Sequence, residues 1–289
     1  MIGKATRSLG NAWDDGRGLP YRFVGDDWFG GWTTVAGGFT IQAQGTEGDD
    51  VVTGTDADER YRGLGGNDTI SGGGGRDHLF GDEGDDTIDG GSGNDVLFPG
   101  LGNNVIYGGD GNDQITPDLS GVEGNVFYGG DGSDLLGSDF SSLFGGRGDD
   151  TLQGEGCFMR GGGGNDRLDI GDPFRIDGYS HEVWGGPGFD RFVFDSETGA
   201  PLGGGVQVIH DLSSEDHIDL SPLDARRGRP GDQAFELVPE FTGKQGEMTI
   251  RYDAEHDRTL IELYNDGDNV VDGTIVIPGD FTTFDNFTF

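Results

Sequence analysis

Apolar residues recur every nine positions along the middle of the chain, and the residues between them are mostly glycine, aspartate and asparagine. Units 63–71, 72–80, 81–89 and 90–98 follow one another without a gap, with the consensus G-G-x-G-x-D-x-U-x, where U is a large apolar residue. One apolar residue between polar neighbours is typical of a very short half-buried strand, and the glycine-rich part is typical of a turn. The pattern therefore predicts a solenoid of stacked units.

The glycines allow the backbone to bend sharply, because a residue without a Cβ atom reaches φ > 0 without a clash. Two nine-residue units then complete one coil, so that residues eighteen positions apart lie above one another. This arrangement gives an all-β fold, a parallel β-roll with one inward apolar residue per unit. The expected inward column is Val52, Tyr61, Ile70, Leu79, Ile88, Leu97, Ile106 and Ile115.

An aspartate ends each turn at the sixth position of the unit, where its carboxylate can point back at the carbonyl oxygens of the turn. Calcium takes about six to eight oxygen ligands, and a mixture of carboxylates and backbone carbonyls suits it. The predicted carboxylate ligands are Asp50, Asp68, Asp77, Asp86, Asp95, Asp113, Asp134, Asp150, Asp166 and Asp190. The predicted carbonyl ligands belong to Gly63, Gly65, Gly72, Gly74, Gly81, Glu83, Gly90, Ser92, Gly108, Asp110, Gly129, Asp131, Gly145, Arg147, Gly161 and Gly163.

The composition supports a need for cations. The chain has 60 Gly and a formal net charge of −36. Low hydrophobicity with high charge is typical of a disordered linker, but a linker has no reason to keep aspartate and an apolar residue in fixed phase. The charge argues against nucleic acid or an anionic membrane as a partner. The single Cys157 excludes an internal disulfide, so metal is expected to supply the stability.

The nine-residue count falters after Thr116, and the change separates the two edges of the expected roll. Complete motifs begin again at Gly129, Gly145, Gly161 and Gly185, and the half-coils between them keep the apolar residue but lose the aspartate. The first edge carries Asp50, Asp68, Asp86, Asn104, Asn125, Ser141, Cys157 and His181. The second edge carries Glu59, Asp77, Asp95, Asp113, Asp134, Asp150, Asp166 and Asp190. If each site takes an aspartate from two stacked turns, about eight calcium ions are expected, mostly along the second edge.

The metal-poor side of the roll carries apolar and aromatic residues at outward positions. This aromatic stripe comprises Val105, Tyr107, Val126, Tyr128, Phe144, Phe158 and Trp184. An exposed apolar surface of this kind marks an interface. Either the chain's own terminal segments cover the stripe, or Tyr107, Tyr128, Phe144, Phe158 and Trp184 contact a partner protein, a second copy of the chain or a glycan.

The two ends of the chain lack the repeat, which gives three predicted regions: 1–44, 45–194 and 195–289. The first contains Trp13, Trp28 and Trp32, and we expect it to cap the first coil. The last contains four alternating segments, 234–238, 248–252, 259–264 and 274–277, which predict an antiparallel β cap. Residues 265–269 read as a tight turn, with an additional calcium loop as the alternative.

Motifs for catalysis are not found in the sequence. The five histidines form no H-E-x-x-H pair, there is no G-x-S-x-G elbow, and no glycine run continues as G-K-[ST]. Cys157 is expected to pack as a small residue, and His181 to lie in a turn. The first eleven residues show no apolar signal-peptide region, and no stretch reaches the length of a membrane span. These observations predict a protein that is not an enzyme.

The repeat resembles that of the repeats-in-toxin (RTX, haemolysin-type calcium-binding) proteins over about residues 45–194. The resemblance continues through Phe-Val-Phe at 192–194, Val-Ile-His-Asp-Leu at 208–212 and Asp-His-Ile-Asp-Leu-Ser at 216–221. These segments are similar to the region after the roll in serralysin-type proteases and alginate epimerase modules, although Gln207 stands where relatives often carry an acidic residue. No protease or lipase domain accompanies them.

The family resemblance implies export through a type I secretion channel, with an uncleaved C-terminal signal at residues 285–289. It also implies a chain that stays unfolded where calcium is scarce and folds outside the cell. Two functions follow as hypotheses. The first is a secreted calcium-binding structural or interaction protein. The alternative is a carbohydrate-binding or accessory module like the R-modules of alginate epimerases, although the scattered arginines form no basic track for an anionic glycan.

Overall fold

The computed structural model describes residues 22–23, 33–34, 40–117, 124–171, 181–194, 205–223, 225, 234–265 and 269–289. Every regular element among these residues is a β-strand. The chain divides into two compact units, Met1–Ser138 and Asp139–Phe289. This division does not coincide with the boundaries at 44/45 and 194/195, which stay predictions.

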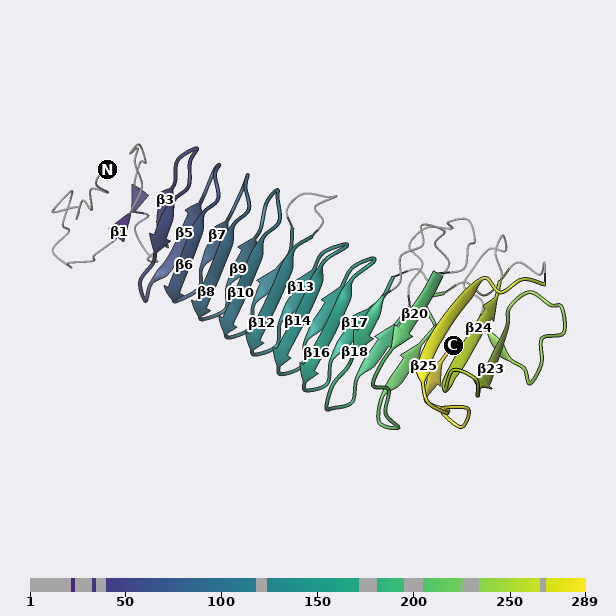
Figure 1. Ribbon diagram of the computed structural model, residues 1–289. Helices are drawn as coiled ribbons and strands as arrows, with labels where there is room; N and C mark the ends of the chain where they lie inside the picture. The colour runs from purple at the N-terminus through teal and green to yellow at the C-terminus, as the bar shows by residue number, and fades with distance from the viewer. Residues whose placement is uncertain are drawn as a thin grey trace. The chain divides into compact units, whose positions relative to one another are not determined.

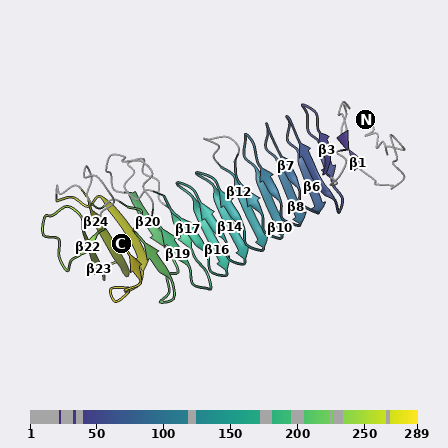
Figure 2. The same cartoon turned by 180° about the vertical axis from the view of Figure 1, so that it is seen from behind.

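The strands of the first unit alternate between two sheets, and successive coils lie side by side in Figure 1 and, from behind, in Figure 2. One sheet contains β1 (Arg22–Phe23), β4 (Val51–Thr53), β6 (Thr69–Gly74), β8 (Thr87–Ser92), β10 (Val105–Asp110) and β12 (Val126–Asp131). The other contains β2 (Thr33–Thr34), β3 (Thr40–Gln44), β5 (Asp58–Arg62), β7 (His78–Phe80), β9 (Val96–Phe98), β11 (Gln114–Ile115) and β13 (Leu135–Gly137). β1 and β2 pair antiparallel with β4 and β3, and the remaining neighbours pair parallel.

The register of these parallel strands is the eighteen-residue period of the sequence. Ile70 pairs with Ile88 in one sheet, and Leu79 pairs with Leu97 in the other. The inward column is buried as the pattern predicts, from Val52 at 7% exposure to Ile88 at 0%. The parallel β-roll expected from the nonapeptide is therefore the observed fold of this unit.

The two sheets differ in strand length, a difference that the nonapeptide pattern did not predict. Strands β6, β8, β10 and β12 span six residues each because they continue through the glycines of the following unit, whereas β7, β9 and β13 span three. Gly73 pairs with Gly91 inside this extension. Gly91 has φ of 102°, and a Cβ atom there would lie 2.1 Å from the carbonyl oxygen of Gly73. Only glycine permits such a close, bent approach of two strands.

The second unit also contains two sheets. One has the order β14 (Ser142–Arg147), β16 (Phe158–Gly163), β18 (Glu182–Trp184), β20 (Gly205–Ile209), β25 (Gly273–Pro278), β24 (Arg258–Tyr264), β23 (Glu247–Asp253) and β22 (Glu236–Leu237). The other has the order β15 (Thr151–Gln153), β17 (Arg167–Asp169), β19 (Arg191–Val193), β21 (His217–Asp219) and β26 (Phe287–Thr288). Strands β14 to β21 pair parallel within their sheets.

The C-terminal strands lie where the alternating pattern predicts them. β23, β24 and β25 form an antiparallel sheet, and β25 then pairs parallel with β20. β22 pairs parallel with β23, so the expected antiparallel arrangement is wrong for the segment 234–238. The last strand, β26, pairs parallel with β21. His217 Nδ1 lies 2.8 Å from Asn286 Oδ1, and the Asn286 side chain donates to the carbonyl oxygen of Asp216 at 2.6 Å. The end of the chain therefore continues the sheet of short strands.

Some sequence expectations fall outside the described residues. These are the expectations about Trp13, Trp28 and Trp32, and the alternatives for the loop at 266–268. Within the described part of the chain there is no helix that could span a membrane.

Candidate calcium sites

The sixth-position residues of the first unit form two hydrogen-bonded ladders, one along each edge of the roll. In each ladder, the backbone N–H of one residue donates to the side-chain oxygen of the residue one coil later. Asp50 donates to Asp68 Oδ1 at 2.8 Å, and Asp77 donates to Asp95 Oδ1 at 2.7 Å. The first ladder comprises Asp50, Asp68, Asp86, Asn104 and Asn125, and the second comprises Glu59, Asp77, Asp95, Asp113 and Asp134.

The second unit has one carboxylate ladder of the same kind. The N–H of Asp150 donates to Asp166 Oδ1 at 2.9 Å, and the N–H of Asp166 donates to Asp190 Oδ1 at 2.9 Å. The ladder continues to Asp216, whose Oδ1 accepts from the N–H of Asp190 at 3.0 Å. Asp216 was missed from the sequence because no glycine-rich turn precedes it, although it begins the Asp-His-Ile-Asp segment already noted.

The second carboxylate oxygen of most ladder residues faces no hydrogen-bond donor. These oxygens are the Oδ2 atoms of Asp68, Asp77, Asp86, Asp95, Asp113, Asp166 and Asp190. The residues are almost fully buried, with exposures of 2% for Asp68 and 0% for Asp77. A buried carboxylate oxygen without a donor is costly unless a cation pairs with it.

Each of these oxygens borders a small space in front of the first glycine of its unit, which we call the cradle. A Cβ atom placed on Gly63 would lie 2.1 Å from Asp68 Oδ2 and 2.4 Å from the carbonyl oxygen of Gly81, one coil further on. The cradle of Gly72 is bounded in the same way by Asp77 Oδ2 at 2.2 Å and the carbonyl oxygen of Gly90 at 2.6 Å. A carboxylate and a carbonyl oxygen converging on one space are the donors that calcium prefers.

The same convergence recurs along both units. Cradles of this kind lie at Gly81, Gly90, Gly108 and Gly145, where the carbonyl oxygens come from Pro99, Gly108, Gly129 and Gly161. The described residues contain no cluster of three or more His, Cys, Asp or Glu side chains that could hold a metal. Each cradle is instead lined by one carboxylate and a backbone carbonyl oxygen, and such oxygen donors fit calcium better than zinc.

Burial raises the pKa of the ladder carboxyls in the absence of a cation. The pKa of Asp68 rises to about 7 and that of Asp77 to about 8, mainly because the charged form loses its hydration, with neighbouring carboxylates adding to the effect. Burial likewise raises the pKa of Asp86 to about 6 and that of Asp190 to about 7. A bound dication would reverse this effect by stabilising the carboxylate form.

The carbonyl groups at the third position of the unit accept backbone hydrogen bonds. Those of Asp110, Asp131 and Gly163 accept a hydrogen bond of 2.7 Å from a glycine N–H one coil earlier. A carbonyl oxygen has two lone pairs, so this bond leaves one available for a cation. Their role as calcium ligands, like that of the aspartates, stays a prediction.

Uncharged side chains replace the aspartates at the turns predicted to lack calcium. Asn104 Oδ1 accepts from the N–H of Asp86 at 2.8 Å, and Gln207 Oε1 accepts from the N–H of His181 at 2.9 Å. An amide oxygen preserves the ladder without a charge that needs a cation. Cys157 and His181 are buried at 1% and 4% exposure, and burial raises the pKa of the Cys157 thiol to about 12. The thiol is therefore protonated at neutral pH and lacks the character of a nucleophile.

A further ladder, exposed to solvent, runs through the fifth position of the repeat. The N–H of Asn67 donates to Asp49 Oδ1 at 2.8 Å, and the N–H of Asp85 donates to Asn67 Oδ1 at 2.8 Å. The same pattern links Asn165 to Asp149 at 2.7 Å in the second unit. Sequence reasoning missed this ladder, although its signal is visible as the Asn or Asp that precedes the motif aspartate in many units.

The aromatic stripe is seen in each unit separately. Tyr107 and Tyr128 stack in the first unit with ring centroids 5.0 Å apart, and they are 42% and 37% exposed. In the second unit, Phe158 lies 4.8 Å from Trp184, whose other neighbour is the stacked ring of His210 at 4.0 Å. Phe144 lies 5.6 Å from Phe158, and the guanidinium of Arg160 lies 4.8 Å above the Trp184 ring. In each unit, the stripe thus presents neighbouring aromatic rings, stacked at Tyr107–Tyr128 and Trp184–His210 and tilted at Phe144–Phe158 and Phe158–Trp184.

Comparisons with known proteins agree with this geometry. A family model described as "RTX calcium-binding nonapeptide repeat (4 copies)" matches residues 42–70, 62–97 and 100–119. Among solved structures, the chain is similar to the AlgE6R3 subunit of the mannuronan C5-epimerase from Azotobacter vinelandii, at 22% identity and a TM-score of 0.26, over 68% of this chain and 80% of that chain. No curated protein matches the chain.

Parallel coils with buried carboxylates converging on carbonyl oxygens define the class of calcium-binding β-rolls. Within this class, the chain carries RTX calcium-binding nonapeptide repeats, and RTX repeats bind calcium. This assignment rests on the repeats and the geometry of their turns, whereas the likeness to the epimerase subunit contributes nothing to it.

Proposed function

We propose that the protein is a secreted calcium-binding structural or interaction protein whose roll folds when it binds extracellular calcium. The observation that carries the proposal is the row of buried Oδ2 atoms without donors, of which those of Asp68, Asp77, Asp86, Asp95 and Asp113 each face a carbonyl oxygen across a cradle. We assign the chain no catalytic step. Its buried carboxylates stand in ladders in which each one has the same role.

Electrostatics gives the reason for coupling folding to calcium. Folding brings carboxylates of stacked turns together inside a chain with a formal net charge of −36. Without a cation, each buried carboxylate either stays charged at a cost or takes up a proton, as its raised pKa shows. Because the unfolded chain holds no preformed site, the free energy of calcium binding becomes free energy of folding.

The site assignment follows from the cradles. Asp68 and Asp86 would hold calcium on the first edge, and the aspartate ladder of the second edge would hold the remaining ions, which gives the expected total of about eight. Extracellular calcium modules bind with Kd values of about 10⁻⁴–10⁻³ M, so the roll would be empty inside a cell and filled outside. That difference supports secretion, for which we propose the C-terminal residues 285–289 as the signal.

A calcium titration tests the proposal. The purified chain is followed by far-UV circular dichroism from chelator to about 10 mM calcium, with light scattering on the same samples. We expect an unfolded chain in chelator and a cooperative gain of β structure in calcium. Magnesium is the matched control ion, because it demands near-octahedral geometry and gives up its water reluctantly. A chain that is folded in chelator would overturn the proposal.

The partner surface is proposed to be the aromatic stripe. Stacked, exposed Tyr107 and Tyr128 present apolar area at low entropic cost, which is typical of binding surfaces. A protein or a second copy of the chain is the favoured occupant. Binding of a uronate glycan in millimolar calcium would instead favour the carbohydrate-binding alternative.

A further inference from the structure

The two turns of the first coil, residues 45–62, differ in sequence from those that follow. Both have threonine at the second position of the unit, Thr46 before Asp50 and Thr55 before Glu59. The next units have Leu64, Gly73, Asp82 and Gly91 at this position. The difference places a hydroxyl group beside the carboxylate in the first coil only.

These threonines donate hydrogen bonds to the carboxylates of their own turns. Thr46 donates its N–H to Asp50 Oδ2 at 2.6 Å, and its hydroxyl oxygen lies 3.2 Å from the same atom. Thr55 repeats the arrangement on Glu59 Oε1, with its N–H at 3.2 Å and its hydroxyl at 2.5 Å. Each first-coil carboxylate thus receives two donors from within its own turn.

The turns one coil later lack such donors. Asp68 follows Asp50 on the first ladder and Asp77 follows Glu59 on the second, and the Oδ2 atoms of both are buried without a hydrogen-bond donor. A cation and a pair of N–H and O–H donors are alternative partners for one carboxylate oxygen. The first coil has the donors, whereas the second coil has the oxygens that need a cation.

The cradle of Gly45 contains a further group that later cradles lack. A Cβ atom on Gly45 would lie 2.4 Å from Tyr61 Oη, 2.5 Å from Asp50 Oδ2 and 2.6 Å from the carbonyl oxygen of Gly63. The phenol hydroxyl therefore reaches into the space where only a carboxylate and a carbonyl converge one coil later. The hydroxyl group thus takes up part of the space in which a cation would lie.

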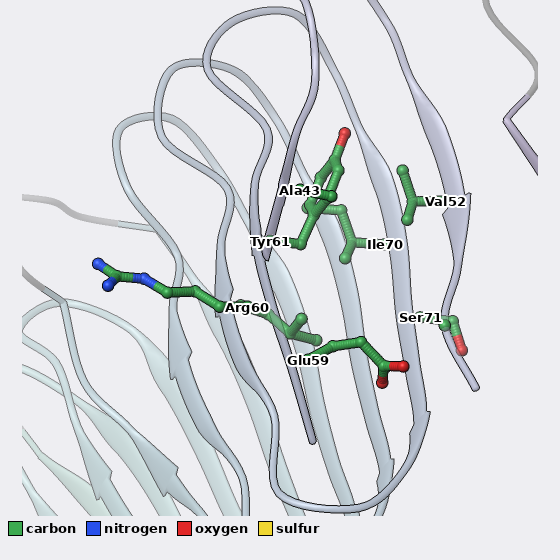
Figure 3. A pocket seen from close by; sticks show the side chains of 10 residues that line it. Ala43, Val52, Glu59, Arg60, Tyr61, Ile70 and Ser71 are labelled. Atoms are coloured by element: carbon green, nitrogen blue, oxygen red, sulfur yellow. The ribbon is translucent and has the colours of Figure 1, made fainter. Parts of the chain in front are cut away.

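The packing of the first coil makes room for this tyrosine. Tyr61 occupies the inward position of β5, where the next strand has Leu79, and the strand before it has the small Ala43. Figure 3 shows the pocket that these residues line, with the Tyr61 hydroxyl and the Glu59 carboxylate pointing to opposite ends. The Tyr61 ring is 3% exposed, so its hydroxyl is held in place by the core.

We propose that the first coil takes no calcium: Thr46 and Thr55 donate hydrogen bonds to the carboxylates of its turns, the Tyr61 hydroxyl lies in the cradle of Gly45, and the calcium sites begin at Asp68 and Asp77. The proposal rests on the calcium-dependent folding proposed above and changes the role expected of Asp50. The first coil then provides a metal-independent end on which the calcium-dependent coils stack. The expected total of about eight calcium ions stays the same, because the first edge keeps the cradles of Asp68 and Asp86.

The end of the carboxylate ladder in the second unit shows the same chemistry. Asp216 is the last residue of that ladder, and its Oδ2 accepts from the N–H of Ser213 at 2.6 Å. Its neighbour Asp190, one coil earlier, has a buried Oδ2 without a donor. Each of these terminal turns therefore has a Thr or Ser whose backbone N–H donates to the carboxylate of the turn.

A matched pair of substitutions tests the proposal. Asp50→Asn and Asp68→Asn make the same change on the same ladder, one coil apart. Calcium ions are counted by native mass spectrometry on folded protein at saturating calcium, and the folding midpoint is measured by circular dichroism. We expect Asp50→Asn to keep the wild-type number of ions and a midpoint within about 2-fold, and Asp68→Asn to lose one ion.

The second ladder gives an independent pair if Asp68→Asn fails to fold. Glu59→Gln is expected to keep the ion count, and Asp77→Asn to lose one ion. Loss of an ion in Asp50→Asn or Glu59→Gln would overturn the proposal. If wild-type protein binds calcium and neither member of a pair changes the count, the ladder is not the metal site, and the proposed function fails as well.

Discussion

The sharpest test of the cradle is the replacement of one glycine by alanine. Gly161 and Gly163 both lie in β16, two residues apart, and neither has a left-handed φ. A Cβ atom on Gly161 would lie 2.2 Å from Asp166 Oδ2 and 2.7 Å from Asp166 Cγ. A Cβ atom on Gly163 would have no atom of the described residues within 4 Å. The first methyl group fills a cradle, whereas the second points into open space.

The expected size of the effect follows from linkage between binding and folding. A site that is saturated at about 100 times its Kd contributes about 2.7 kcal/mol to stability. Gly161→Ala must displace the Asp166 carboxylate, because 2.2 Å is far inside van der Waals contact. Loss of this site corresponds to a fall in Tm of about 5–10 °C for a unit of this size. Gly163→Ala is expected to be neutral or stabilising by up to about 1 kcal/mol, because alanine loses less chain entropy than glycine.

The assay is thermal unfolding by circular dichroism for wild type and both variants, at a series of calcium concentrations. Isothermal titration calorimetry on the same proteins counts the sites. We expect the Tm difference between Gly161→Ala and wild type to grow with calcium, since the lost contribution grows with the logarithm of its concentration. Equal calcium dependence of the two variants would refute the cradle as the calcium site. A large loss in Gly163→Ala would show that the glycine-rich end of β16 tolerates no side chain at either position.

Three further predictions follow from the ladders and the stripe. Asp95→Asn should lose one calcium ion and about 2.7 kcal/mol of stability at saturating calcium. Asp110→Asn changes an exposed residue at the third position of its unit and should lose neither. Equal losses of calcium by the two variants in calorimetry would contradict the assignment of Asp95 as a ligand. Burial raises the pKa of Asp77 to about 8, so the contribution of this carboxyl to the stability of the calcium-free roll is fully present below the unfolded-state value of about 4 and is lost as pH rises through 8. Because protons compete with calcium, the calcium midpoint should rise as pH falls from about 8 to about 5, and a constant midpoint would contradict this reasoning. Tyr107→Ser with Tyr128→Ser should leave the circular dichroism unchanged and abolish association in light scattering, and retained association would exclude this part of the stripe.

The repeat predicted most of the roll because the coil is a local structure. The phase of glycine, aspartate and apolar residue determines which residues turn, which pair and which point inward, as the register of Ile70 with Ile88 shows. It also assigned Asp68 and Asp77 to different ladders before any contact was known. The sequence could not show the six-residue strands of one sheet, since their extension depends on glycine pairs such as Gly73 with Gly91 meeting across coils.

The terminal turns were the hardest part to predict. Asp50 and Asp68 occupy the same position of the motif, and only their surroundings separate them. The Thr46 donors come from the turn of Asp50 itself, whereas the Tyr61 hydroxyl reaches the cradle of Gly45 from the neighbouring strand β5. Asp216 was likewise hidden, because its place in the ladder depends on a backbone hydrogen bond from Asp190, 26 residues earlier.

The sequence by itself determined the nine-residue turn, the inward apolar column and the two edges that carry or lack aspartate. Those features follow from local backbone sterics and from a strict period, so a reader of the sequence can count them. Only the tertiary structure decided which carboxylate oxygens face a carbonyl oxygen across a cradle and which already have donors. The physical reason is that a carboxylate's need for calcium depends on every polar group around it, and these groups come from its own turn, from the coil before and from the coil after.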